Sequence, residues 1–259
     1  MRIDALIFDV DGTLADTEEA HRVAFNLAFE WHGLAWHWQA AEYRELLKVG
    51  GGKERIRSYI DTLTVAGAER ERLNLMVRDI HFDKMRLYSS VLRNGTVPLR
   101  AGVARLLDEA LAQGCKLAIA STTTAVNIDL LLRSTLGPRG LDMFTVIACG
   151  DHVAHKKPAP DIYQLALREL DMLPAHAVAF EDSASGLHAA TAAGLCTIVT
   201  PNFWTEDHDF SDAALVLPHL GSPDVPLPRE PGRRLQAAAW LTCQDIERVA
   251  ARHANFATQ

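Results

Sequence analysis

Short apolar runs alternate with amphipathic helical segments along the second half of the chain, and this alternation restricts the possible folds more than any other feature. The apolar runs predict strands at 116–121, 145–149, 178–180, 196–200 and 214–217. Apolar residues at helical spacing predict helices at 103–111, 126–136, 161–170 and 185–193. Strands and helices in this order form right-handed crossovers, which place the strands in parallel. We therefore predict an α/β fold with a doubly wound parallel sheet.

A block of helical patterns separates this region from one earlier strand, predicted at 3–10. Helices are predicted at 16–31, 53–64 and 68–92, with no convincing strand between them. In the first of these, Asp16 and Glu19 have the spacing of a capping box. Its buried face is expected to consist of Ala20, Val23, Ala24, Leu27, Ala28 and Trp31.

These patterns predict a core with one insertion and a tail. The α/β core comprises residues 1–15 and 94–222, and an α-helical cap at 16–93 is inserted after the first strand. The tail, 223–259, begins with several prolines and contains a helix at 235–253 that we expect to pack on the core.

The charge balance argues against nucleic acids and membranes as partners. The chain has 26 basic and 33 acidic residues, a net charge of −7, and no basic stripe. Nucleic-acid binding needs clustered positive charge, and no apolar run approaches the roughly 18 residues of a membrane span. A few local cations can still bind an anionic small molecule.

The N-terminus reaches an acid at residue 4 without an apolar signal segment, so we expect a cytoplasmic protein. We also expect it to be a monomer.

Polar residues follow several predicted strands, and this is where the active sites of open α/β sheets form. The candidates, in chain order, are Asp9, Asp11, Ser121, Lys157, Glu181 and Asp182. Asp9 and Asp11 point the same way if the strand continues through them. Closely spaced carboxylates resist joint ionisation, and a hard divalent cation relieves that repulsion. The set therefore predicts a Mg²⁺ site that also accepts a phosphate.

The same residues are suited to phosphoryl transfer. A carboxylate such as Asp9 is a competent covalent nucleophile. Lys157 can neutralise the transferred group, and Ser121 can donate to its oxygens. Each feature alone has an ordinary structural explanation, such as a turn, a solvated lysine or a helix cap. The hypothesis therefore depends on all four features occurring in chain order, each near the end of its own strand: the pair Asp9 and Asp11, then Ser121, then Lys157, then the pair Glu181 and Asp182.

Four segments resemble the four motifs of the haloacid dehalogenase-like phosphatase superfamily. They are Asp9-Val10-Asp11-Gly12-Thr13, Ser121, Lys157-Pro158-Ala159-Pro160-Asp161 and Glu181-Asp182-Ser183-Ala184-Ser185-Gly186. The helical insertion is similar to the cap of that superfamily. The resemblance implies that Asp9 becomes an aspartyl phosphate and that Asp11 is the general acid and base. It also implies that Asp9, the backbone carbonyl of Asp11, and Asp182 bind Mg²⁺, with Glu181 in support.

The cap sequence indicates which phosphate ester is used. Three glycines at 50–52 precede a predicted helix, and Lys53 and Arg55 add positive charge, which favours an anion. A flexible loop before a solvated helix is the alternative. With Glu18, Tyr43 and Arg44, this segment resembles the xylulose-1,5-bisphosphate phosphatases encoded with Calvin-cycle operons, which remove the 1-phosphate of a Rubisco inhibitor. The expected substrate-binding residues are Glu18, His21, Tyr43, Arg44, Gly51, Gly52, Lys53, Arg55, Thr122 and Thr123.

Two alternatives remain open. β-Phosphoglucomutases are similar in their motifs, and Thr17, His21 and Lys53 stand where such mutases have comparable cap contacts. The mutase pattern has a lysine near the position of Thr124, however, and this chain lacks it. The second alternative is a non-catalytic binding or regulatory relative. The intact set of acids argues against that alternative.

Overall fold

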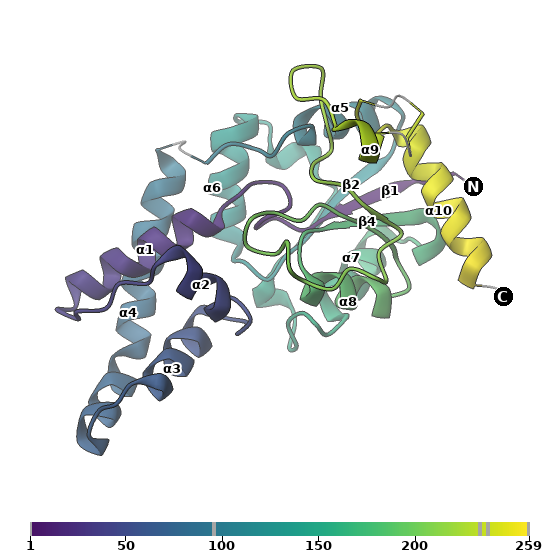
Figure 1. Ribbon diagram of the computed structural model, residues 1–259. Helices are drawn as coiled ribbons and strands as arrows, with labels where there is room; N and C mark the ends of the chain where they lie inside the picture. Colours follow the sequence, from purple (N-terminus) through teal and green to yellow (C-terminus); the bar gives the residue numbers. More distant parts are fainter. Residues whose placement is uncertain (1, 95–96, 233–234, 237–238, 258–259) are drawn as a thin grey trace. The chain divides into compact units, whose positions relative to one another are not determined.

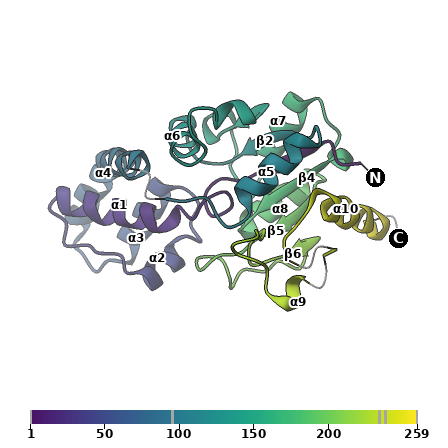
Figure 2. The same ribbon diagram turned by 90° about the horizontal axis from the view of Figure 1, so that it is seen from above.

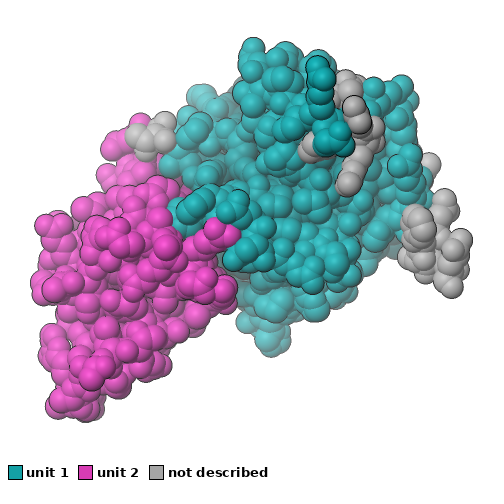
Figure 3. All heavy atoms as spheres, in the orientation of Figure 1, with its two compact units in different colours: residues 1–16, 97–259 teal, residues 17–96 magenta. Residues whose placement is uncertain are grey.

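The computed structural model describes residues 2–94, 97–232, 235–236 and 239–257. Of the predicted tail, residues 233–234, 237–238 and 258–259 therefore lie outside the described residues. Contacts between Cα atoms divide the chain into two compact units, which Figure 3 distinguishes by colour. The first unit comprises residues 1–16 and 97–259, and the second comprises residues 17–96.

The first unit is built around a six-stranded parallel sheet with the order β3-β2-β1-β4-β5-β6. Figure 1 shows its central strands β2, β1 and β4 side by side. The strands are β1 (Ala5–Phe8), β2 (Lys116–Ala120), β3 (Val146–Ala148), β4 (Ala177–Glu181), β5 (Cys196–Val199) and β6 (Leu215–Val216). Phe8 of β1 is in register with Ile119 of β2 and with Phe180 of β4. All four residues of β1 are buried, as expected for a strand covered on both faces. The predicted α/β fold with a parallel sheet is confirmed.

Helices cover both faces of this sheet (Figures 1 and 2). α7 (Asp161–Leu170) packs against β2 and β3, and α8 (Ala184–Ala192) packs against β4 and β5. α5 (Val103–Ala112) packs against β2 from the other side, and α10 (Cys243–Ala257) packs against α5 and β5. The unit also contains α6 (Ala125–Leu136), α9 (Arg229–Gly232) and the short 3₁₀ helices η1 (Leu141–Met143), η2 (Gly150–His152) and η3 (Pro174–His176).

The chain leaves and re-enters this unit at adjoining points. Ala15 and Leu99 form an isolated antiparallel bridge. The next amide, that of Arg100, donates to the carbonyl of Leu14 at 2.8 Å. These bonds hold the two ends of the insertion side by side.

In the described part of the second unit all regular secondary structure is helical, which confirms the predicted helical insertion after the first strand. It consists of α1 (Glu18–Trp31), α2 (Ala40–Leu46), α3 (Gly52–Thr62) and α4 (Gly67–Arg93). Of these, α2 was not among the helices expected from the sequence. No helix in the described parts of the chain is both long enough and apolar enough to cross a lipid bilayer.

The predicted start of α1 is wrong, and its predicted buried face is right only for Ala20, Ala24 and Ala28. The helix begins at Glu18 with Thr17 as its N-cap, so Asp16 and Glu19 do not form the expected capping box. Glu19 instead accepts hydrogen bonds from Arg22 at 2.6 and 2.9 Å.

Leu27 and Trp31 are 42% and 73% exposed, although both were expected on the buried face of α1. The buried aromatic residues are Phe25 and Phe29, whose rings lie 4.9 and 4.7 Å from that of Trp38. Contact with Trp38, in the loop after α1, therefore buries Phe25 and Phe29 beside the predicted alanines, in place of Leu27 and Trp31.

The C-terminal helix also begins later than predicted, at Cys243 rather than at residue 235. Thr242 and Asp245 explain this start, because they form a reciprocal capping pair. Thr242 Oγ1 accepts from the amide of Asp245 at 3.1 Å, and Asp245 Oδ2 accepts from the amide of Thr242 at 3.2 Å. Asp245 Oδ1 also accepts from the amide of Gln236 at 2.8 Å, which fixes the preceding chain outside the helix.

Candidate active site

The loop after β1 brings Asp9 to the carboxyl edge of the sheet. The amide of Asp9 donates to the carbonyl of Phe180 at 3.0 Å, so this residue still lies alongside β4 although β1 ends one residue earlier. The chain then turns sharply, and the amides of residues 13–15 donate to the carbonyl of Val10. Gly12 has a φ of +84° in this turn, a conformation that glycine adopts without steric cost.

Three buried acids converge at this edge from two neighbouring strands. Asp9 follows β1, Glu181 ends β4 and Asp182 follows it. One ligand atom from each lies within 4.8 Å of the others. Their exposed fractions are 7%, 1% and 5%, respectively. Lys157 Nζ donates to Asp9 Oδ1 and to Glu181 Oε1, both at 2.6 Å. The structure therefore brings four of the predicted site residues into one cluster.

Burial and mutual repulsion control the protonation of this cluster. Burial raises the pKa of Asp9 to about 8; the Lys157 ammonium opposes this rise, and the Glu181 carboxylate adds to it. Burial alone would lower the pKa of Lys157, but the two carboxylates hold it above its ordinary value. A single ammonium therefore faces more negative charge than it can compensate.

Glu181 is held in place by four donors. Its Oε1 accepts from Lys157 and also from the hydroxyl of Tyr163, at 2.5 Å. Its Oε2 accepts from the amide of Asp182 at 3.3 Å and from the hydroxyl of Ser183 at 3.5 Å. Burial raises the pKa of Tyr163 well above its ordinary value, so its hydroxyl remains a donor at physiological pH. These bonds fix the orientation of Glu181 independently of any ligand.

Asp182 lies directly against the turn that follows β1. A Cβ atom built on Gly12 would be 2.1 Å from Asp182 Oδ2, so only glycine fits at that position. Asn202, in the loop after β5, donates from Nδ2 to Asp182 Oδ2 at 2.8 Å. Asp182 is thus positioned from two sides.

The remaining predicted core residues lie at the same edge of the sheet. The register of β1 with β2 places Ser121 level with the loop that carries Asp9. Ser121 is buried, and its Oγ accepts from the amide of Thr123 at 3.2 Å. Thr122 is exposed and Thr123 is half-buried. Thr124 has a structural role, since its side chain caps α6 by accepting from the amide of Asn127.

Asp11 is half-buried, and its carboxylate is not part of the acidic cluster found among the described residues. The prediction that Asp9 and Asp11 share a strand face is wrong, because β1 ends at Phe8 and the chain turns after Val10.

Several of the predicted substrate-binding residues form a network within the helical unit. The hydroxyl of Tyr43 donates to Glu18 Oε2 at 3.1 Å and accepts from Arg55 Nη1 at 3.0 Å. The other donors of Arg55 bond the carbonyls of Leu46 and Val49 at 3.1 and 3.3 Å. Arg55 therefore fastens the loop before α3, a role that the sequence did not indicate.

The glycine segment ends at the start of α3. Gly51 is the N-cap with a φ of +92°, and Gly52 is the first helical residue. A Cβ atom on Gly52 would lie 2.7 Å from the ring of His81. Lys53 is exposed in the first turn, and the described residues offer it no hydrogen-bond or ion-pair partner. Its ammonium is accessible to an anion from solvent.

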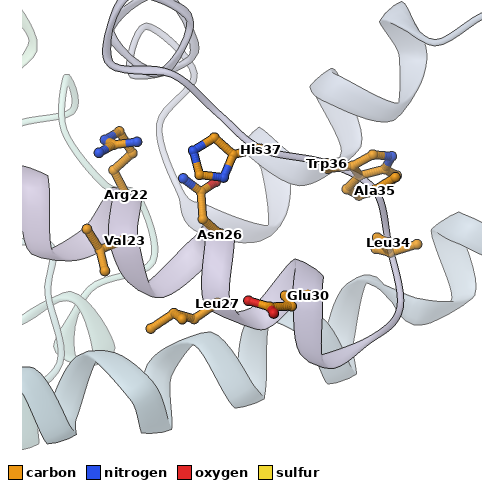
Figure 4. A pocket seen from close by; sticks show the side chains of 9 residues that line it. All are labelled: Arg22, Val23, Asn26, Leu27, Glu30, Leu34, Ala35, Trp36 and His37. Carbon is orange, nitrogen blue, oxygen red and sulfur yellow. The ribbon is translucent and has the colours of Figure 1, made fainter.

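His21 and Arg44 are half-buried in α1 and α2. His21 stacks on Tyr88 at 3.7 Å, and its Nδ1 lies 2.6 Å from Nζ of Lys84, which is buried. The helical unit also has a surface pocket of about 440 Å³ between α1 and the following loop (Figure 4). None of the predicted site residues lines this pocket.

The donor set of the buried cluster fits a hard divalent cation. Three carboxylates with ligand atoms this close offer only oxygen, which Mg²⁺ prefers. Burial is the main cause of the raised pKa of Asp9, and the single Lys157 ammonium faces three carboxyl groups. A bound cation would favour the ionised form of all three carboxyl groups. The residues present therefore fit the metal expected from the sequence.

Sequence reasoning missed Tyr163, Asn202 and Lys84. Asn202 lies three residues beyond β5, so attention to the carboxyl end of that strand would have pointed to it. Tyr163 and Lys84 lie inside helices, and their spacing in the sequence carries no signal of their contacts with Glu181 and His21.

Comparison with known proteins agrees with this geometry. A sequence profile described as haloacid dehalogenase-like hydrolase matches residues 6–200. Protein CbbY of Rhodobacter capsulatus is 46% identical over 222 residues, which cover 86% of this chain and 96% of that protein.

Two solved structures are also similar. A crystal structure of a CbbY mutant from Rhodobacter sphaeroides in complex with xylulose-(1,5)bisphosphate superposes with a TM-score of 0.77. It is 46% identical, over 84% of this chain and 94% of that one. A putative β-phosphoglucomutase from Thermotoga maritima superposes with a TM-score of 0.61 at 27% identity, over 83% and 94% of the two chains.

Proposed function

The chain belongs to the haloacid dehalogenase-like hydrolases and is a phosphatase of that family, and on this basis we propose that it hydrolyses xylulose 1,5-bisphosphate to xylulose 5-phosphate and phosphate. The observation that carries the choice of substrate is the relative crystallised with xylulose-(1,5)bisphosphate, to which this chain is 46% identical. The buried cluster of Asp9, Glu181 and Asp182 supports a metal-dependent reaction. The reaction would remove an inhibitor of Rubisco.

We assign the chemical steps to residues at the carboxyl edge of the sheet. One Asp9 oxygen attacks the phosphorus atom, and the bond between phosphorus and the sugar oxygen breaks. Asp11 donates a proton to that oxygen as it leaves. Asp11, now a carboxylate, accepts a proton from water as the water oxygen attacks the phosphorus atom. The bond between phosphorus and the Asp9 oxygen then breaks, which releases inorganic phosphate and regenerates the Asp9 carboxylate. Lys157, which donates to Asp9 at 2.6 Å, compensates negative charge on the transferred group.

We propose that Asp9, the backbone carbonyl of Asp11, and Asp182 bind Mg²⁺, with Glu181 in support. The bound cation would neutralise charge on the phosphoryl oxygens. Ser121 would donate its hydroxyl proton to one of those oxygens.

Selectivity for a bisphosphate would come from the remaining predicted residues. Lys53 is exposed at the N-terminus of an eleven-residue helix, which suits it to the phosphate that is not cleaved. The other predicted substrate contacts are Glu18, His21, Tyr43, Arg44, Gly51, Gly52, Arg55, Thr122 and Thr123. We propose that the binding partner is this small sugar bisphosphate in the cytoplasm, and that neither a nucleic acid nor a membrane takes part.

Phosphate release with Mg²⁺ tests this function directly. Purified protein should release one equivalent of phosphate from xylulose 1,5-bisphosphate, and excess chelator should abolish the reaction. Asp9→Asn should lose several orders of magnitude in kcat while keeping the fold. Substantial turnover by that variant, or full activity in excess chelator, would overturn the mechanism.

A β-phosphoglucomutase activity is the second candidate, favoured by the likeness to the putative mutase. The lysine of the mutase pattern is absent at Thr124, whose side chain caps α6. We therefore expect conversion of β-glucose 1-phosphate to the 6-phosphate to be negligible beside phosphate release. Efficient isomerisation with little free phosphate would reverse this ranking.

A further inference from the structure

Asn202, in the loop after β5, joins the two strand ends that carry the acidic cluster. Its Nδ2 donates to Asp182 Oδ2 at 2.8 Å, and the same nitrogen donates to the carbonyl of Gly12 at 3.3 Å. Gly12 belongs to the turn that follows Asp9, and Asp182 follows β4. The side-chain amide of Asn202 therefore bonds both the turn after Asp9 and the carboxylate of Asp182.

The turn around Asn202 determines which end of its amide faces Asp182. Its Oδ1 accepts from the amide of Trp204 at 2.8 Å and from the hydroxyl of Thr205 at 3.4 Å. A carboxylate and a backbone carbonyl can only accept hydrogen bonds, so the NH₂ end must face Asp182 and Gly12. The backbone N–H of Asn202 also donates to Thr205 Oγ1 at 3.1 Å, and this bond closes the turn further.

Arg100 holds the backbone on both sides of this contact. Its guanidinium donates to the carbonyls of Thr200 and Pro201, at 2.6 and 2.8 Å, immediately before Asn202. The same guanidinium donates to the carbonyl of Gly12. Arg100 stands where the chain re-enters the first unit, so the fold itself presents these donors to the two loops.

We propose that Asn202 is a positioning residue for the metal site and that Arg100 holds it in place. A hydrogen bond to Oδ2 restricts rotation of the Asp182 carboxylate, and so presents that carboxylate to the cation in one orientation. The bond to Gly12 fixes the turn beside it. Partners that orient metal ligands in this way commonly contribute ten- to a hundredfold in metal affinity. The inference rests on the proposed function, because it takes Asp182 as a Mg²⁺ ligand.

Titration of Mg²⁺ alone into the purified full chain tests the inference. Asn202→Ala should raise the Mg²⁺ dissociation constant about tenfold or more, measured by calorimetry. At saturating Mg²⁺, a tenfold loss removes about 1.4 kcal/mol of the metal-induced stabilisation, seen as a smaller rise in Tm. In kinetics, the half-saturating Mg²⁺ concentration should rise more than KM for the substrate.

Thr205→Val is the matched control, because it removes hydrogen bonds of the same turn while the Trp204 amide, which donates to Asn202 Oδ1 at 2.8 Å, still keeps the NH₂ end of Asn202 towards Asp182. It should lower Tm but leave the Mg²⁺ dissociation constant unchanged. An equal loss of Mg²⁺ affinity in Thr205→Val and Asn202→Ala would mean that the turn alone matters, and would overturn the inference.

Two further outcomes separate this inference from the proposed function. If the unaltered protein does not bind Mg²⁺, the metal-dependent function itself fails. If it binds Mg²⁺ and Asn202→Ala binds equally well, only the positioning role fails. Should Asn202→Ala not fold, Arg100→Lys tests the same contact, because one ammonium cannot replace a guanidinium that bonds carbonyls in both loops. We expect at least threefold weaker Mg²⁺ binding by Arg100→Lys, and unchanged binding would refute the role of Arg100.

Discussion

The affinity of the acidic cluster for Mg²⁺ should depend steeply on pH because Asp9 must lose a proton to bind the cation. Its pKa in the metal-free protein is about 8, raised chiefly by burial. At pH 6 nearly all Asp9 is protonated, so the apparent dissociation constant exceeds the intrinsic one about 100-fold; at pH 8 the factor is about 2. Mg²⁺ should therefore bind about 50-fold more tightly at pH 8 than at pH 6.

Calorimetry in buffers of different ionisation enthalpy checks both parts of this reasoning. The apparent affinity should rise with pH, and binding at pH 7 should release close to one proton. Asp9→Asn is the matched control, because it keeps an oxygen ligand but cannot titrate. Its Mg²⁺ affinity should be nearly constant between pH 6 and 8. Equal affinities of the unaltered protein at these two pH values, without proton release, would refute the raised pKa of Asp9.

The same shift has a consequence for stability. The pKa of Asp9 in the folded state lies above its ordinary value of 3.8, so between about pH 4 and 8 the folded state binds more protons than the unfolded state. The metal-free protein should therefore lose stability as pH rises through this window, and saturating Mg²⁺ should reduce the loss.

Three substitutions extend these tests. Lys53→Ala should reduce kcat/KM for the bisphosphate about 30-fold, because the proposed charge contact with the second phosphate is lost when the bound substrate covers the lysine. Hydrolysis of para-nitrophenyl phosphate should barely change, and an equal loss on both substrates would exclude contact with the second phosphate. Tyr163→Phe should lower the unfolding free energy by about 2 kcal/mol in urea titrations, because Glu181 loses a buried donor; an unchanged value would mean that this bond contributes nothing. Gly12→Ala should abolish turnover and Mg²⁺ binding, because the new methyl group would displace an acid of the cluster. Gly33→Ala is its control, since Gly33 also has a positive φ but open space around it, and it should cost only about 1–2 kcal/mol of stability with full activity.

The sheet and its acidic edge could be predicted because both follow from local patterns. A fully buried parallel strand is apolar throughout, as in Ala5–Phe8, and polar residues just beyond such strands must meet at one edge. The meeting of Asp9 with Glu181 and Asp182 needs only that rule. The chemical roles of these residues and of the cap residues stay predictions, which the experiments above address.

The details that the sequence did not reveal depend on contacts between distant residues. Two overlapping apolar stripes run along α1, and only packing against Trp38 decides that Phe25 is buried and Leu27 exposed. Likewise, the bond from Asn202 to Asp182 joins residues 20 positions apart through the shape of two loops. Neither contact produces a regular spacing of residues that could be recognised in the sequence.

The Ala15–Leu99 bridge bears on how the protein reaches its fold and how such folds diversify. The strands that flank β1 come only after the 83 residues that separate Ala15 from Leu99 in the sequence. Closing such a loop costs roughly 2–3 kcal/mol more than closing a five-residue turn, at about 0.6 kcal/mol for each doubling of length. An insert that forms its own helices early would bring these two ends together and so shorten the effective loop. Because its ends adjoin, one insert can also be exchanged for another during evolution without shifting the register of the sheet, leaving substrate choice to change while the catalytic edge stays the same.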